Sequence, residues 1–461
     1  MRVSQILVVC STVFGLMLAS VQGQVPPPTP QTIDPGKPAD QPASAVKPEA
    51  DAAKGSPYLR VVEDKGKSIA LEIATRDFVR SNGTGPRVGL VGVAHIGDSA
   101  FYHAVQKLLE NYDVVLYESV KPPGTGGAGG DTDQQRIDST KAAMQFVGGM
   151  IETEHARSDK YPADLNGLKT YAASLDPRLA KFIQAALTDG WGHQLVYRLK
   201  ADDDGGGYSL ISLGADGKAG GEGANADLNL ADQPHPDPLP LSKEDGLQSQ
   251  LASALGLKFQ LDALDYDKQN WRCSDMAMDE VNRRLQAKGL DFSLIGGTLA
   301  GTSLSAKLVK VMLNLMKIAD SFMGGAITDT FKIVMIELLG DPKLTEMGLD
   351  QLGQGFGAVI VQDRNQVAVD DLKKLIEQEP GTKSVAILYG AAHMPDMAAK
   401  LAEQLGYQPA PADPKDADST CAEHWLTAIK VNYADTSMSP AEINQLRAQI
   451  KQMIRMQLRA K

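Results

Sequence analysis

Two short segments far apart in the chain share the pattern that most constrains the fold. Residues 88–97 (VGLVGVAHIG) and 385–394 (VAILYGAAHM) each run an apolar strand into Gly-x-x-His. Glycine at a strand end lets another group approach the backbone closely. The histidine three residues later projects from the carboxyl end of the strand, where α/β folds place their ligand sites. We therefore expect His95 and His393 to share one site.

A third strand end adds a carboxylate to this pair. In residues 111–120 (NYDVVLYESV), the apolar residues 114–116 are typical of a buried strand, and Glu118 lies at its tip. Two imidazoles and one carboxylate suit zinc, manganese or iron, with positions left open for water or substrate. The sequence predicts a divalent transition metal at His95, Glu118 and His393. The alternative is that the histidines only hydrogen-bond to the scaffold.

The composition excludes one large class of function. The chain has 461 residues, 43% hydrophobic and 22% charged, which is typical of a globular protein with two or three domains. Its net charge is −11. Nucleic-acid binding needs concentrated positive charge, so nucleic acid is not an expected partner.

The amino terminus has the layout of an export signal. In residues 1–24, Arg2 precedes an apolar run over 6–18 and small residues near a plausible cleavage point. This predicts an exported protein, periplasmic or extracellular; an uncleaved segment that anchors the chain to the membrane is the alternative. Residues 25–57 are rich in proline and alanine and predict an extended linker. Signal removal leaves Cys273 and Cys421, between which one disulfide is an open question.

The order of the segments predicts a nested architecture. Residues 58–123 show strands, a glycine turn and a helix, and this α/β character returns at 246–435 before a C-terminal helix at 436–461. Gly-rich and Pro-rich segments flank residues 131–230, where a long helical pattern precedes two short antiparallel strands. We expect an α/β host domain, with a mixed sheet and helices, split by an inserted α+β domain. Insertions are tolerated at exposed loops.

A loop within that insert concentrates oxygen ligands. Residues 212–230 (SLGADGKAGGEGANADLNL) hold Asp216, Glu222, Asn225 and Asp227 among five glycines. Carboxylate and backbone oxygens suit a hard cation such as Ca²⁺, although the spacing is not that of the helix-loop-helix calcium motif. A flexible acidic surface loop is the alternative.

The insert combines this loop with four further features: a helix near Ile137, Tyr161-Pro162, GLKTY at 167–171 and DGWGHQLVY at 189–197. In these features it resembles the C-terminal domain of the type II secretion major pseudopilin, the G subunit. The resemblance implies a stabilising calcium ion and secretion-machinery proteins as partners. The implied ligands are the Asp216 and Asp227 carboxylates and the backbone oxygens of Leu213 and Lys218, with Asn225 or Glu222 as further candidates.

The host domain is similar to the TraB/Tiki family, which carries two Gly-x-x-His motifs and a strand-end glutamate. His95, Glu118 and His393 fit these positions, and DRNQVAVDDL at 363–372 is similar to the family's Arg-Asn or Arg-Asp string. The resemblance implies a protease-like hydrolase that uses Mn²⁺ or Zn²⁺ on a protein or peptide. Glu118, Arg364 and Asn365 are then the candidate catalytic residues.

Three functions stay open at this point. The chain could be an exported metal-dependent hydrolase with a calcium-stabilised accessory domain. It could instead be a non-enzymatic component or accessory of type II protein secretion that binds through the pseudopilin-like domain. In the third interpretation both parts are structural, and the histidines are hydrogen-bonding core residues.

Overall fold

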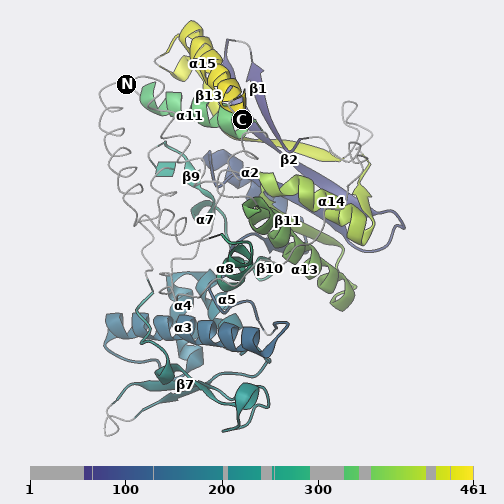
Figure 1. Ribbon diagram of the computed structural model, residues 1–461. Helices are drawn as coiled ribbons and strands as arrows, with labels where there is room; N and C mark the ends of the chain where they lie inside the picture. Colours follow the sequence, from purple (N-terminus) through teal and green to yellow (C-terminus); the bar gives the residue numbers. More distant parts are fainter. Residues whose placement is uncertain are drawn as a thin grey trace.

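The protein has a larger lobe built on one sheet and a smaller lobe built on a long helix (Figure 1). A computed structural model describes the chain over ten ranges. These are residues 57–64, 66–127, 129–200, 206–239, 252–253, 255–290, 326–341, 355–411, 422–436 and 438–459. The predicted signal peptide, nearly all of the predicted linker and Cys421 lie outside them.

A mixed eight-stranded sheet forms the larger lobe. Its strands are β1 (Leu59–Asp64), β2 (Ser68–Arg80), β3 (Arg87–Val93), β5 (Val114–Tyr117), β10 (Trp271–Cys273), β11 (Ser384–Gly390), β12 (Tyr407–Pro409) and β13 (Glu423–Asn432). The order is β1-β2-β3-β11-β5-β10, and β12 and β13 also pair with β2. Every partner of β2 is antiparallel to it, whereas β3, β11, β5 and β10 are parallel. The mixed α/β fold expected from the sequence is confirmed.

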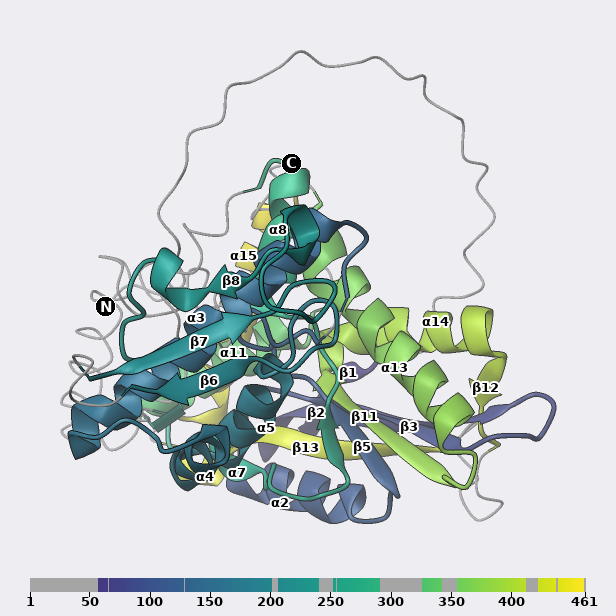
Figure 2. The same cartoon turned by 90° about the horizontal axis from the view of Figure 1, so that it is seen from below.

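Helices cover both faces of this sheet. Along β11, Val385, Ile387 and Tyr389 pack with α13 (Arg364–Gln378) and α14 (Met394–Leu405). The alternate residues Ala386 and Leu388 share a core with α2 (Ser99–Leu109), α11 (Ala326–Leu339) and α15 (Pro440–Arg459). A strand buried on both faces reads as an unbroken apolar run, which is why β11 shows no polar alternation. Figure 2 shows β3, β11 and β5 side by side, with α13 beyond them.

Short elements complete the larger lobe. They are β4 (Ile96–Gly97), β9 (Lys258–Phe259), α7 (Gln260–Ala263), α8 (Met278–Ala287), a π-helical segment η4 (Ala358–Asp363) and the 3₁₀ turn η5 (Ala391–His393). The π-helical segment runs directly into α13, so the helix that carries Arg364 begins with a distorted turn. Such turns are frequent at functional sites.

The smaller lobe consists of three helices and a three-stranded antiparallel sheet. Its elements are α3 (Asp133–Ser158), α4 (Leu165–Leu175), α5 (Pro177–Ala186), β6 (Val196–Leu199), β7 (Tyr208–Ser212) and β8 (Leu228–Asn229), with 3₁₀ turns η2 (Gly223–Asn225) and η3 (Leu230–Asp232). Thr132 and Gln135 form a capping box at the start of α3. Met144, Val147 and Ile151 of this helix lie in the lobe's own apolar core. The long helix and two antiparallel strands were expected; β8 was not.

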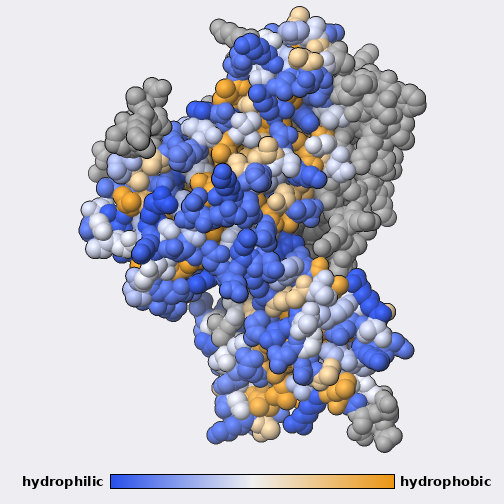
Figure 3. All heavy atoms as spheres, turned by 180° about the vertical axis from the view of Figure 1, so that it is seen from behind, coloured by the Kyte–Doolittle hydropathy of each residue, from blue (hydrophilic) through white to orange (hydrophobic). Residues whose placement is uncertain are grey.

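The surface is mainly polar on the side shown in Figure 3, where apolar residues gather only in small groups. A bilayer-spanning helix needs about 20 consecutive apolar residues, and none of the helices in the described ranges meets this requirement. The helix expected at the C-terminus is α15, and it begins with a capping arrangement in which Ser439 and Glu442 hydrogen-bond to each other.

Candidate functional site

Four parallel strands end at the same edge of the sheet, and each delivers a polar residue there. β11 lies between β3 and β5, and β10 lies beyond β5. His95 follows β3, Glu118 follows β5 and His393 follows β11, while Asp275 follows β10. β3 and β5 follow each other along the chain among the strands of this sheet, but β11 lies between them in space. The chain connection therefore crosses over at β11. Open α/β sheets bind ligands at such crossovers.

Gly390 marks the point on which three of these side chains converge. A methyl group placed on Gly390 would lie 3.4 Å from Glu118 Oε2, 3.6 Å from His95 Nε2 and 3.6 Å from His393 Cδ2. The structure thus brings together the two histidines and the glutamate that the sequence singled out. Glu118 and His393 are buried, whereas His95 is partly exposed. The space between the three is bounded on one side by a residue with no side chain.

Glu118 is held as a buried carboxylate. Its Oε1 accepts a hydrogen bond from Arg364 Nη2 at 2.7 Å, and its Oε2 accepts one from the Gly390 N–H at 2.6 Å. Burial acts to raise the pKa of Glu118, but His393, Arg364 and His95 together outweigh it and lower the pKa. Glu118 is therefore ionised at neutral pH.

His393 is held in one tautomer by Asn365. Asn365 Nδ2 donates to the His393 carbonyl at 3.1 Å and to Asp396 at 2.8 Å, which leaves Asn365 Oδ1 as the atom 2.7 Å from His393 Nδ1. Nδ1 must therefore carry the proton. Burial lowers the pKa of His393 against the attraction of Glu118, so the ring is neutral. Its Nε2 then presents a lone pair to Glu118 Oε1 at 3.6 Å.

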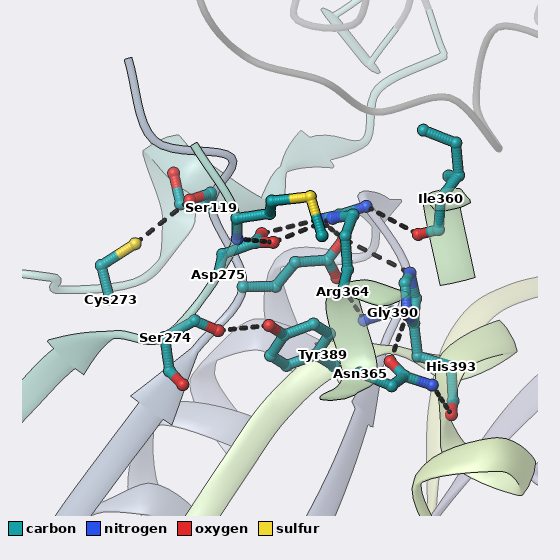
Figure 4. A network of polar contacts seen from close by, with 12 residues as sticks. Ser119, Cys273, Ser274, Asp275, Ile360, Arg364, Asn365, Tyr389, Gly390 and His393 are labelled. Carbon is teal, nitrogen blue, oxygen red and sulfur yellow. Dashed lines mark hydrogen bonds and ion pairs between the residues drawn. The ribbon is translucent and has the colours of Figure 1, made fainter. Parts of the chain in front are cut away.

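Asp275 is a member of the site that the sequence analysis missed. Arg364 is almost fully buried and donates through Nε and Nη2 to the two Asp275 oxygens, at 2.9 and 2.7 Å. Its Nη1 donates to the Ile360 carbonyl at 3.3 Å. Figure 4 shows Arg364 between Asp275 and Ile360, with Asn365 turned toward His393. An aspartate just after the short strand at 271–273 was the available signal, by the same logic that singled out Glu118.

Tyr389 and Cys273 belong to strands that lead into the site. Tyr389 donates a short hydrogen bond to the Ser274 carbonyl. Cys273 Sγ lies 3.1 Å from the Ser119 carbonyl, and burial raises the pKa of the Cys273 thiol to about 12. A thiol that stays protonated is a poor nucleophile and a poor metal ligand. Cys421, with which the sequence allows a disulfide, lies outside the described residues.

His95, Glu118 and His393 are of the residue types that bind divalent metals, although their side chains lie farther apart than the ligands of a bound ion. Imidazole nitrogen and carboxylate oxygen are ligands for zinc, manganese or iron. No group of three or more His, Cys, Asp or Glu side chains in the described ranges has the geometry of a metal site. The neutral His393 Nε2 and the ionised Glu118 nevertheless face each other as two hydrogen-bond acceptors. A cation between them would remove the repulsion between their lone pairs.

The acidic glycine loop of the smaller lobe is closed at its base. Ala215 N donates to the Ala224 carbonyl at 2.9 Å, so the two arms of the loop lie side by side. All five loop glycines have positive φ, and a methyl group on Gly214 or Gly221 would come within 2.7 Å of the Asn225 backbone. The side chains of Asp216, Glu222, Asn225 and Asp227 are exposed. The glycines therefore let the backbone fold tightly while the acidic groups stay at the surface.

Asp189, which the sequence analysis did not select, fixes the start of that loop through hydrogen bonds. This buried carboxylate accepts the N–H groups of Trp191 and His193 through Oδ1, at 3.0 and 2.8 Å. Its Oδ2 accepts the Ser212 hydroxyl at 2.7 Å. Asp189 thus ties the turn before β6 to the residue that opens the loop.

Comparison with known proteins identifies the smaller lobe. Residues 129–231 match the family described as "Type II secretion system (T2SS), protein G". The type II secretion system core protein G of Xanthomonas campestris is 32% identical over 100 residues, which cover 22% of this chain and 68% of that protein. No solved structure matches the chain. Through residues 129–231, the chain belongs to the type II secretion system protein G family.

Proposed function

We propose that this chain is an exported partner of type II protein secretion that carries a metal-dependent hydrolase site on its larger lobe. The protein G domain supports the connection to secretion, because it is the part of the chain that the secretion protein shares. The hydrolase site is the cluster of His95, Glu118 and His393 at Gly390. The larger lobe's similarity to the TraB/Tiki family is part of this proposal.

One observation carries the hydrolase proposal: three potential ligands surround a space that only glycine leaves open. His95 Nε2, His393 Nε2 and one oxygen of Glu118 would hold the ion. A divalent ion such as Mn²⁺ or Zn²⁺ would supply a Lewis acid for a substrate carbonyl. Asn365 supports this role, since a metal-binding histidine usually donates its other ring N–H to a fixed acceptor.

Arg364 has an orienting role in this proposal. Its contacts with Asp275, Glu118 and the Ile360 carbonyl occupy the guanidinium, and almost none of the side chain is exposed. It therefore holds Glu118 in place and balances two buried carboxylates. The sequence placed Arg364 among the candidate catalytic residues. Its burial favours an effect through the electric field of its positive charge.

We also propose that the protein G domain interrupts the larger lobe as an insertion. The strands of the main sheet come from residues 59–117 and 271–432, on both sides of 129–231 in sequence. The smaller lobe has its own apolar core and its own sheet. A calcium ion at Leu213, Asp216, Lys218, Asn225 and Asp227 would stabilise this domain.

A second candidate function has its own supporting observation. Glu118 already accepts two short hydrogen bonds, from Arg364 and from Gly390, so the negative charge of Glu118 is balanced without an ion. In that case the larger lobe is a scaffold, and the chain acts as a non-enzymatic accessory of secretion through the protein G domain.

Gly390→Ala separates the two functions. The backbone at Gly390 has φ −52°, which any residue adopts, and the new methyl group would make contacts of 3.4 Å or more. The variant should fold normally but fill the space for the ion. Gly381→Ala, at an exposed position with no atom within 4 Å, is the matched control.

The full chain would be loaded with Mn²⁺ or Zn²⁺, desalted and analysed for metal. We expect one ion per chain in the natural protein and in Gly381→Ala, and less than about a tenth of that in Gly390→Ala at an unchanged melting temperature. Equal metal content in the two variants, or none in the natural protein, would rule out the hydrolase site.

A further inference from the structure

The segment after β9 lies directly against His95. The Gln260 N–H donates to the His95 carbonyl at 2.8 Å, next to the pairing of Ile96 with Phe259. The Gln260 side chain is buried, and its Nε2 donates to the Tyr266 hydroxyl at 3.1 Å. Gln260 therefore contacts His95 and Tyr266 at the same time.

The Gln260 side-chain oxygen is a buried acceptor without a well-aligned donor. Oε1 makes no hydrogen bond to any described residue, although Gln260 is buried and its own N–H is bonded to the His95 carbonyl. Since His95 Nε2 faces Gly390, Nδ1 is the nitrogen left to donate to Gln260 Oε1. A buried polar atom without a partner calls for an explanation, and a fixed ring N–H provides one.

Tyr266 is fixed in turn by aromatic and cationic neighbours. Its buried ring makes edge contacts with Tyr117 and Trp271, at centroid distances of 5.0 and 5.3 Å. On another side, the Arg178 guanidinium lies 5.5 Å from the ring centroid. Arg178 is itself held by Asp176, with Nη2 and Oδ2 2.6 Å apart. The position of Tyr266 therefore depends on a residue of α5.

A second residue of α5 holds the backbone of the same loop. Lys181 Nζ donates to the carbonyls of Tyr266, Lys268 and Trp271, at 3.1, 3.3 and 3.3 Å. Burial lowers the pKa of Lys181, and Asp267 and Asp265 oppose that effect. One ammonium group thus gathers three carbonyls of a loop in the larger lobe. Both Arg178 and Lys181 belong to the protein G domain.

We infer that the protein G domain positions His95 through Lys181, Arg178, Tyr266 and Gln260. α5 contacts the 266–271 loop, the Tyr266 hydroxyl accepts from the Gln260 amide, and the Gln260 N–H donates to the His95 carbonyl. The proposed last step is a hydrogen bond from the His95 ring to the free Gln260 Oε1. The inference rests on the proposed function, in which His95 binds a metal. It assigns the secretion-type domain a role in the site of the other lobe, so that movement of α5 changes metal affinity.

Four variants of the full-length protein test this series of contacts. Tyr266→Phe removes the hydroxyl that holds Gln260, Lys181→Met removes the ammonium at similar volume, and Gln260→Ala removes the acceptor. Gln260→Glu keeps an acceptor for the ring, and the Tyr266 hydroxyl can donate to it. Lys169→Met is the matched control, because Lys169 lies in the same lobe and bonds only to Gln184 among the described contacts.

Titration with Mn²⁺ or Zn²⁺ should show dissociation constants about 10- to 100-fold higher for Tyr266→Phe, Lys181→Met and Gln260→Ala. Gln260→Glu and Lys169→Met should stay near the natural value. Melting temperatures of the metal-free proteins identify variants that are merely unfolded. Natural affinity in both Lys181→Met and Tyr266→Phe would overturn the inference.

Nitrogen-15 NMR of the histidine rings gives an independent result without metal. We expect His95 to be the Nδ1–H tautomer in the natural chain and a mixture in Gln260→Ala. If the natural chain binds no metal but this change is seen, the proposed function fails while the positioning of His95 stands. An unchanged His95 signal in Gln260→Ala would refute the positioning itself.

Discussion

Arg364 Nη2 donates to Glu118 Oε1 at 2.7 Å, although 246 residues separate them in the sequence. The same guanidinium group makes a two-point contact with Asp275. One arginine therefore joins the end of β5, the end of β10 and the start of α13. The two carboxylates at the centre of the site are compatible with burial only while this cation is present.

Replacing Arg364 should destabilise the whole larger lobe. Arg364→Met leaves Glu118 and Asp275 buried without a countercharge, and breaking a buried ion pair in this way typically costs about 3–5 kcal/mol. Arg364→Lys keeps the charge but not the two-point geometry, so we expect an intermediate loss. Urea unfolding measures both. A loss below about 1 kcal/mol for Arg364→Met would show that the carboxylates are not held as described.

Calcium should raise the melting temperature of the protein G domain. With Ca²⁺ at about 100 times its dissociation constant, the expected stabilisation is about 2.7 kcal/mol. The double variant Asp216→Asn, Asp227→Asn should lose this response, whereas Asp232→Asn, an exposed position outside the loop, should keep it. Calorimetry with Ca²⁺ and with EGTA provides the comparison. A response that survives the double variant would place the ion elsewhere.

Glu423 should make the stability of the sheet depend on pH. Burial acts to raise its pKa, but hydrogen bonds from Trp425 and Arg76 outweigh it, so the folded pKa lies below the ordinary value. A lowered folded pKa adds stability above the unfolded pKa of about 4.3, and that stability disappears as the pH falls through the folded value.

Glu423→Gln should therefore be about 1–2 kcal/mol less stable than the natural chain at pH 7. The difference should shrink toward zero below about pH 4. Glu403→Gln, an exposed position on α14, is the control and should show no such trend. Denaturant midpoints at several pH values measure this stability difference. A difference that grows as the pH falls would contradict the lowered pKa of Glu423.

The candidate site could be predicted from the sequence to the extent that its signals are local. Gly92 and Gly390 each precede a histidine by three residues at the end of an apolar strand, and Glu118 ends another. Each of these three signals can be recognised within a single segment of the sequence. That these strands share an edge followed from the general rule for α/β sheets.

The remaining features depend on which segments meet in space. Nothing in residues 384–390 says that β11 lies between β3 and β5. Asp275 was missed because β10 has only three residues and gives a weak pattern. Gln260 and Lys181 act through contacts between segments that are distant in sequence, so no local pattern singles them out.

The most direct measurement is the transition-metal content of the purified full chain and of its His95→Ala, His393→Ala double variant. We expect about one Mn²⁺ or Zn²⁺ per natural chain and almost none in the double variant, with calcium binding by residues 213–227 unaffected. Equal transition-metal content in the two proteins, or its absence from the natural chain, would contradict the claim that these histidines and Glu118 form one metal site.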